Sequence, residues 1–86
     1  MIEKKFSGKK CLVTGGAGFI GSSLVEELIS NGASVKIIDN FSVGEQNVKL
    51  LTKIGAEIFE YDICNYEEIR ELFTNIDYVF HLAAMN

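Results

Sequence analysis

The sequence predicts an α/β fold with a parallel sheet, and three observations support this fold class. Strand-like runs of β-branched and aromatic residues alternate with amphipathic, helix-like runs through all 86 residues. The strand-like runs are centred near residues 12, 36, 58 and 80, about 22–24 residues apart, as expected for a strand plus a crossover helix. A glycine-rich segment joins the first strand to the first helix.

Four strands are expected, each ending at one edge of the sheet. They cover residues 9–14, 34–39, 56–62 and 77–84, and the sequence segments that predict them are "KKCLVTG", "SVKIID", "AEIFEYD" and "DYVFHLAA". Strands that are joined by helices run parallel, and their crossovers are right-handed. We therefore expect one small domain over residues 1–86, with strand order 3-2-1-4.

Three crossover helices are expected over residues 19–32, 45–55 and 65–73, each with one apolar face. The residues predicted to face inward are Ile20, Leu24, Val25, Leu28 and Ile29 in the first helix, Val48, Leu51 and Ile54 in the second, and Ile69, Leu72 and Phe73 in the third.

Residues typical of helix ends bound these segments. Asn31-Gly32 and Gly55 are expected to end the first two helices, because glycine adopts the left-handed backbone of a helix C-terminus. Asn65 is a candidate N-cap of the third helix, and Glu68 three residues later suggests a capping box.

Composition excludes several classes of protein. Four of the eight basic residues lie within the first ten positions, so the remaining chain carries four basic and eleven acidic residues, which argues against general nucleic-acid binding. No apolar run is long enough to span a membrane, and no signal peptide is visible.

Cys11 and Cys64 are far apart and suggest two buried thiols, so we expect a cytoplasmic protein without a metal site.

The segment "LVTGGAGFIGS" is the main functional signal. Its glycines fit either G-x-G-x-x-G, through Gly16, Gly18 and Gly21, or T-G-x-x-G-x-x-G, through Gly15, Gly18 and Gly21. Glycines after a strand allow a tight turn, close approach of a pyrophosphate and close helix packing, while the helix N-terminus attracts phosphate. A tight turn without a ligand is the alternative, but it would need fewer glycines.

Asp39 ends the second strand, 18 residues after Gly21. An acidic residue at this place accepts hydrogen bonds from the adenosine ribose of a dinucleotide. Its carboxylate would repel a 2′-phosphate, and "NFSVG" after it offers no arginine to hold one, so NAD is favoured over NADP. The alternative is that Asp39 is an ordinary turn residue beside Asn40.

With these residues placed, the chain resembles the N-terminal part of an extended short-chain dehydrogenase/reductase of the NAD-dependent epimerase/dehydratase family, which acts on nucleotide sugars. The resemblance rests on four segments, "VTGGAGFIGS", "DNFSVG", "YDICN" and "VFHLAAMN". It implies a partial Rossmann fold of four strands that forms a truncated dinucleotide-binding domain.

The resemblance also implies a set of cofactor-binding residues. Phe19 and Ile20 would donate backbone N–H groups to the pyrophosphate, and Asp62 and Ile63 would border the adenine. The full set is Gly15, Gly18, Phe19, Ile20, Gly21, Asp39, Asn40, Phe41, Ser42, Gly44, Asp62, Ile63, Leu82, Ala83 and Ala84. Asp62 could instead simply end a strand, and His81 reads as a packed, hydrogen-bonded residue rather than as an acid–base catalyst.

The family's catalytic Tyr-x-x-x-Lys pair is not found in this sequence. Tyr61, Tyr66 and Tyr78 are followed four residues later by Asn65, Arg70 and Leu82. We therefore expect no catalytic residue in this chain, which would be a truncated product, a fragment or a degenerate gene.

Three functions are compatible with this expectation. The chain could be the NAD-binding portion of a nucleotide-sugar epimerase or dehydratase, a stand-alone NAD-binding or redox-sensing domain, or an interaction module. An apolar fourth strand at the edge of the sheet predicts that the chain forms homo-oligomers.

Overall fold

The computed structural model describes residues 6–15, 19–40, 45–61 and 65–82, which form one four-stranded sheet with helices on both faces. Its elements, in chain order, are β1 (Lys10–Thr14), α1 (Phe19–Ser30), β2 (Ser34–Asp39), α2 (Glu45–Lys53), β3 (Glu57–Glu60), α3 (Tyr66–Ile69), the 3-10 helix η2 (Arg70–Phe73) and β4 (Tyr78–His81).

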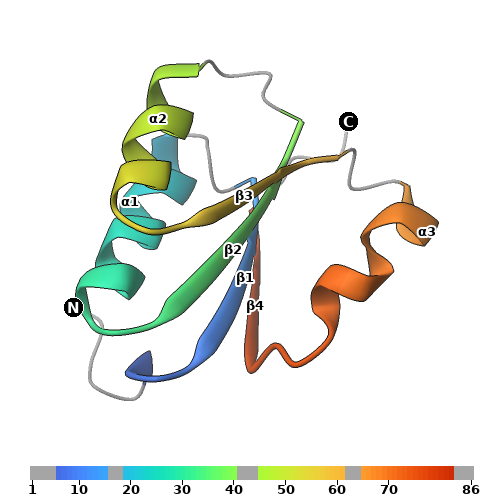
Figure 1. The fold of residues 1–86 in the computed structure, drawn as a ribbon, viewed down its shortest axis with the longest axis horizontal. Helices are drawn as coiled ribbons and strands as arrows, with labels where there is room; N and C mark the ends of the chain where they lie inside the picture. The colour runs from blue at the N-terminus through green and yellow to red at the C-terminus, as the bar shows by residue number, and fades with distance from the viewer. Residues whose placement is uncertain (1–5, 16–18, 41–44, 62–64, 83–86) are drawn as a thin grey trace.

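The sheet has the predicted topology. Its strand order is β3-β2-β1-β4, and all three neighbouring pairs are parallel. Helices α1 and α2 lie on one face and α3 lies on the other (Figure 1). The chain thus moves outward from β1 to β3 on one side and crosses back to β4 on the other, as right-handed crossovers require.

Two apolar clusters hold the layers together. The larger one joins the α1–α2 layer to the sheet and includes Val13, Val25, Leu28, Ile37 and Leu51. The smaller one joins α3 and η2 to the opposite face through Leu12, Ile38 and Ile69, with Leu72 and Phe73 packed against it. The predicted inward residues of the third helix are therefore confirmed.

The glycines predicted to end α1 and α2 have left-handed backbones. Gly32 has φ +91° and Gly55 has φ +110°. The Ala33 N–H donates to the Leu28 carbonyl at 3.0 Å, and the Ala56 N–H donates to the Leu51 carbonyl at 3.0 Å. This six-to-one bond is typical of the glycine-terminated helix end, which satisfies carbonyls that the helix itself cannot pair.

Two predicted inward residues were wrong. Ile20 is 72% exposed and Ile54 is 41% exposed. Ile20 lies in the first turn of α1, and Ile54 follows the last residue of α2, so both lie at helix ends. The spacing along a helix predicts a shared face, but it does not show where the sheet beneath that face stops.

The third helix also differs from its prediction. It is expected as one helix over residues 65–73, but α3 changes into the 3-10 helix η2 after Ile69. In a 3-10 helix, residues three apart lie above one another, which keeps Leu72 in line with Ile69 over the sheet. The capping box is absent, because the Asn65 side chain makes no capping hydrogen bond; its backbone carbonyl accepts from the Glu68 N–H at 3.0 Å.

Candidate functional site

Backbone hydrogen bonds join the carboxyl ends of the four strands to one another. The Gly15 N–H donates to the Ile38 carbonyl at 2.8 Å, and the Leu82 N–H donates to the Thr14 carbonyl at 2.9 Å. At the same ends of the neighbouring strands β2 and β3, the Tyr61 N–H donates to the Asp39 carbonyl at 3.2 Å. This edge is where open α/β sheets bind ligands.

The turn after β1 has the backbone that the glycine-rich segment predicts. Gly15 has φ +77°, a conformation that side-chain-bearing residues rarely adopt. Only four residues separate the end of β1 at Thr14 from the start of α1 at Phe19. Gly21 is buried in the first turns of α1, where a residue without a side chain allows close packing on the sheet.

The N-terminus of α1 is suited to an anion. No acidic residue lies in its first turn, so no carboxylate there competes with a phosphate for the positive end of the helix dipole. Backbone N–H groups at a helix N-terminus can bind an anion without a lysine or arginine, which agrees with the acidic character of the chain.

Asp39 lies beside this turn. It is the last residue of β2, is 7% exposed, and directly follows Ile38, whose carbonyl accepts from Gly15. A buried carboxylate next to a glycine turn fits the adenosine ribose of a dinucleotide. The donors and the acceptor that the sequence predicts for NAD thus lie at one edge, and the described residues fit this cofactor.

The structure describes seven of the predicted cofactor-binding residues, namely Gly15, Phe19, Ile20, Gly21, Asp39, Asn40 and Leu82. Only the backbone of Phe19 is described. The remaining predicted residues lie outside the described part of the chain, namely Gly18, Phe41, Ser42, Gly44, Asp62, Ile63, Ala83 and Ala84. The individual roles of all fifteen remain predictions.

His81 has a specific partner that sequence reasoning missed. Its Nδ1 atom lies 2.8 Å from Oγ1 of Thr14, and the two residues are register partners in the β1–β4 pair. The hydrogen bond agrees with the prediction for His81, but the prediction that the residue is packed was wrong, because His81 at the end of the edge strand β4 is exposed. The partner could have been found from the sequence only by aligning the two strand ends, which are 67 residues apart.

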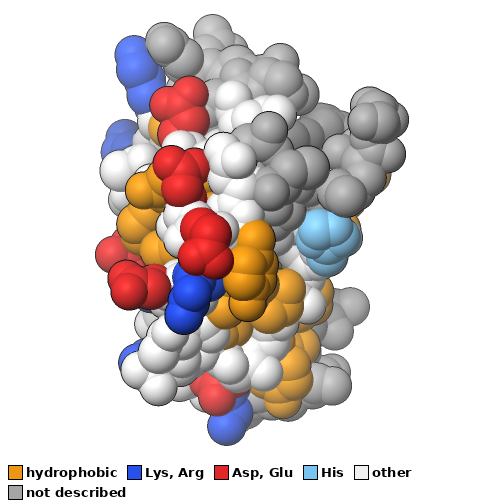
Figure 2. All heavy atoms as spheres, turned by 90° about the vertical axis from the view of Figure 1, so that its right-hand side faces the viewer, with side chains coloured by type: hydrophobic (Ala, Val, Ile, Leu, Met, Phe, Trp, Pro, Cys, Tyr) orange, Lys and Arg blue, Asp and Glu red, His pale blue; other side chains and the backbone are white. Residues whose placement is uncertain are grey.

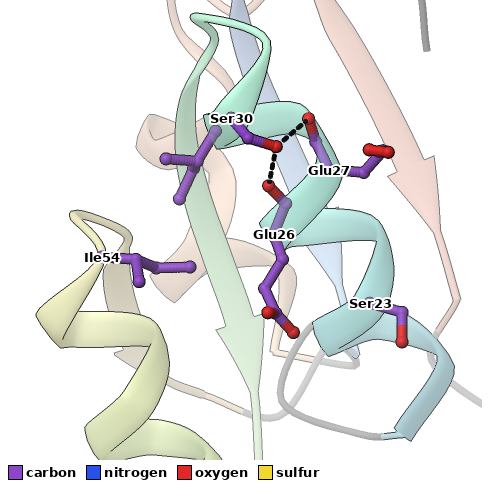
Figure 3. Close-up of a pocket in the computed structure, with 6 residues that line it drawn as sticks. Ser23, Glu26, Glu27, Ser30 and Ile54 are labelled. Atoms are coloured by element: carbon purple, nitrogen blue, oxygen red, sulfur yellow. Dashed lines mark hydrogen bonds between the residues drawn. The ribbon is translucent and has the colours of Figure 1, made fainter. Parts of the chain in front are cut away.

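Two hollows lie away from this edge. One of about 470 Å³ lies between α1 and the residue that follows α2, and it is lined by Ser23, Glu26, Glu27, Ile29, Ser30 and Ile54 (Figure 3). The other, of about 350 Å³, opens at the amino ends of the strands, near Lys36 and Asn75. The two carboxylates of the first make it unsuited to a pyrophosphate.

Within the described ranges, no group of three or more potential metal ligands is found, and no helix is long and apolar enough to cross a membrane.

The fold, the glycine turn and the buried acidic residue together define a Rossmann-type nucleotide-binding domain. Comparison with known proteins identifies its family. A family model described as "NAD dependent epimerase/dehydratase family" matches residues 11–86, and the chain belongs to this family. The predicted resemblance is confirmed, and the predicted cofactor, NAD, agrees with the family's dependence on NAD.

Several relatives have names that describe enzymes acting on UDP-sugars. The chain is 44% identical over 77 residues to the UDP-N-acetyl-alpha-D-glucosaminuronate decarboxylase of Bacillus cytotoxicus. This aligned region covers 90% of the chain and 24% of that protein. It is 42% identical over 83 residues to the UDP-glucose 4-epimerase of Neisseria meningitidis, covering 90% of the chain and 24% of that protein.

Solved structures share the fold. The enzyme WbmF of Bordetella bronchiseptica, solved in complex with NAD+ and UDP, has a TM-score of 0.84 at 34% identity, over 98% of this chain and 25% of that one. The UDP-glucose 4-epimerase of Thermotoga maritima, solved with UDP-glucose, has a TM-score of 0.76 at 42% identity, over 88% and 24%. The chain therefore spans about a quarter or less of the length of these relatives.

Proposed function

We propose that this chain is the NAD-binding portion of a nucleotide-sugar epimerase, dehydratase or decarboxylase. The observation that carries the proposal is the link between the glycine turn and Asp39, through the hydrogen bond from Gly15 to the Ile38 carbonyl. This link supports the proposal, because donors for a pyrophosphate and an acceptor for a ribose would then lie at one edge. Relatives named as UDP-sugar enzymes support the substrate class.

The described residues would bind and orient the cofactor. The first turn of α1 would hold the pyrophosphate through the backbone N–H groups of Phe19 and Ile20, with Gly21 allowing the helix to approach. Asp39 would accept hydrogen bonds from the adenosine ribose, and Leu82 would lie toward the nicotinamide. In this family NAD accepts and returns a hydride.

The chain is proposed to bind without completing the reaction. None of its three tyrosines has a lysine four residues later, so these 86 residues hold no Tyr-x-x-x-Lys pair to exchange a proton with the sugar hydroxyl. The proposal therefore covers one domain over residues 1–86 with a binding role. The predicted cytoplasmic location stays a prediction.

Calorimetric titration of NAD, with the mass of the same sample measured by light scattering, tests this proposal. We expect saturable binding with one NAD per chain, because both halves of the site lie on one chain. Absence of binding at millimolar NAD would contradict the proposal and would favour an interaction module.

The second proposed function is self-association through β4. This strand lies at one edge of the sheet, and its residues 78–81 include no lysine, arginine or carboxylate. Tyr78, Val79 and Leu82 are 38%, 48% and 41% exposed. Figure 2, which views the molecule from its α3 side, shows hydrophobic side chains gathered below His81. An exposed apolar edge of this kind recruits another strand.

The opposite edge of the sheet supports the choice of β4. There β3 carries Glu57 and Glu60 at its two ends, and both are exposed. Charged side chains on an edge strand oppose pairing with another strand. Of the two edge strands in the described sheet, β4 is the one without charged lysine, arginine or carboxylate side chains. Two copies would therefore pair β4 with β4 about a twofold axis.

A further inference from the structure

We propose that Thr14 and His81 form a positioning pair that holds the end of β4 against the glycine turn and thereby sets the affinity for NAD. The inference rests on the proposed function of this edge. It assigns His81 a positioning role, and it names Thr14 as the residue through which His81 acts.

The pair is part of a double connection between two strand ends. Oγ1 of Thr14 and Nδ1 of His81 are 2.8 Å apart, and the backbone N–H of the next residue, Leu82, donates to the Thr14 carbonyl at 2.9 Å. Thr14 is 1% exposed whereas His81 is exposed, so only the threonine side of the hydrogen bond is shielded from water. A shielded hydrogen bond competes less with solvent than an exposed one.

The end of β4 depends on this connection because β4 is an edge strand. Within the described sheet it has one neighbour, β1, whereas β1 and β2 each have two. Four register pairs hold β4, and Thr14 with His81 is the last of them. Removing the side-chain bond would leave the hydrogen bond from the Leu82 N–H to the Thr14 carbonyl as the last link between β4 and β1 at the ligand edge.

The same threonine leads directly into the proposed cofactor site. Gly15 follows Thr14, and its N–H donates to the carbonyl of Ile38, the residue before Asp39. A chain of neighbouring bonds thus runs from Leu82 through Thr14 and Gly15 to Ile38. A shift of β4 relative to β1 would change the spacing between the predicted nicotinamide end and the predicted ribose end of the site.

The hydrogen bond to Thr14 gives His81 a positioning role through Nδ1, and Nε2 takes no part in the pair. A neutral imidazole has one donor and one acceptor nitrogen. With Nδ1 engaged by Thr14, the ring is fixed in orientation, and the role of Nδ1 is set by the direction in which the threonine hydroxyl points.

Matched variants at His81 test the pair. The Nδ1 atom of histidine is two bonds from Cβ, and so are the polar atoms of an asparagine side chain. The polar atoms of a glutamine side chain are three bonds from Cβ, so they do not take the place of Nδ1. We expect His81→Gln to weaken NAD binding about three- to tenfold, because NAD binding must then order the end of β4, which one hydrogen bond within the protein otherwise holds in place. His81→Asn should stay within about twofold of the unchanged chain, because it retains the bond to Thr14.

A double-mutant cycle isolates the pair from the other contacts of the threonine. Thr14→Val removes the hydroxyl, and in that background His81→Gln should cause no further loss of NAD affinity. Imidazole ¹⁵N chemical shifts give an independent readout, since Thr14→Val should shift the Nδ1 signal. Urea unfolding of each variant verifies that the chain is folded.

Three results would overturn the inference while NAD still binds the unchanged chain. These are equal affinity for wild type and His81→Gln, equal losses for His81→Gln and His81→Asn, and additive losses in the cycle. If the unchanged chain binds no NAD at millimolar concentration, the proposed function itself fails, and the role of the pair in binding fails with it.

Discussion

Asp39 is the residue on which the choice of cofactor depends. Its carboxylate is buried at the end of β2, next to the strand that leads into the glycine turn. We expect Asp39→Ala to weaken NAD binding about tenfold or more, because hydrogen bonds to a charged group are lost. Binding of NADP should weaken less, since the carboxylate repels its 2′-phosphate.

Calorimetry with both cofactors measures this difference. Glu57→Ala provides the control, because Glu57 is an exposed acidic residue at the amino end of β3. It should leave both affinities unchanged. Equal losses of NAD and NADP affinity in Asp39→Ala would exclude the ribose role.

Cys11 supplies a prediction of pH dependence. Burial, and secondly the negative charge of Asp77, raise the pKa of the Cys11 thiol above its ordinary value of 9.0. The folded chain therefore holds this proton after the unfolded chain has released it. The free energy of unfolding should be unaffected by Cys11 below pH 9 and should fall above it, by at most about 1.4 kcal/mol per pH unit.

Urea unfolding across pH 8–10 tests this, in a Cys64→Ser background that leaves one thiol. The reference is the same chain with Cys11→Ala as well, in which the Cys11 contribution is gone. Identical pH slopes in the two chains would show that the thiol does not titrate differently on folding.

For single residues, the sequence predicts a role only where a pattern of neighbouring or regularly spaced residues indicates it. Asp39 can be predicted because a strand end and its distance from Gly21 are both visible in the chain. The bond between Thr14 and His81 has no such signature. It depends on the register of two strands whose separation in sequence is 67 residues.

Among the elements, α2 shows how the apolar stripe stabilises the fold. Leu51 is 1% exposed and packs in the larger core cluster, while its neighbour Leu50 is 62% exposed. We expect Leu51→Ala to lower the free energy of unfolding by about 2–5 kcal/mol, because it leaves a cavity. Leu50→Ala should change it by less than about 0.5 kcal/mol.

These two substitutions remove the same atoms from the same helix, so helix propensity cancels between them. Urea unfolding measures both. Similar losses for the two variants would contradict the orientation of α2 on the sheet.

Element ends were harder to predict than element faces. The period of apolar residues predicts the inward stripe of each helix, and the buried residues Leu28, Leu51 and Ile69 confirm it. The exposure of Ile20 and the change of helix type after Ile69 depend on where the sheet begins and ends beneath the helices. That is a tertiary property, which a local pattern does not contain.

The topology of the whole molecule could be predicted in full. Parallel strands with right-handed crossovers leave few arrangements, and the order 3-2-1-4 is the one observed. The same order leaves β4 at an edge. We expect the chain to self-associate at about 100 μM, since an exposed apolar edge of this kind is a pairing surface.

Val79→Lys tests this association, because a charge on an edge strand opposes pairing. Val79 is 48% exposed, so the lysine can reach water without unfolding the strand. Light scattering should show a monomer for this variant and a larger species for the unchanged chain. Leu50→Lys, at an exposed apolar residue on α2, should leave the mass unchanged. A monomeric unchanged chain at this concentration would contradict the proposal.

The central claim is that NAD binds at the carboxyl ends of the strands, and amide NMR during an NAD titration tests it most directly. We predict that the largest shift changes fall on the carboxyl-edge amides, including Gly15, Asp39, Asn40 and Leu82. Amides that precede the strands should stay unchanged, namely Gly8, Gly32, Gly55 and Asn75. Changes confined to that opposite edge, or no changes at millimolar NAD, would contradict the account.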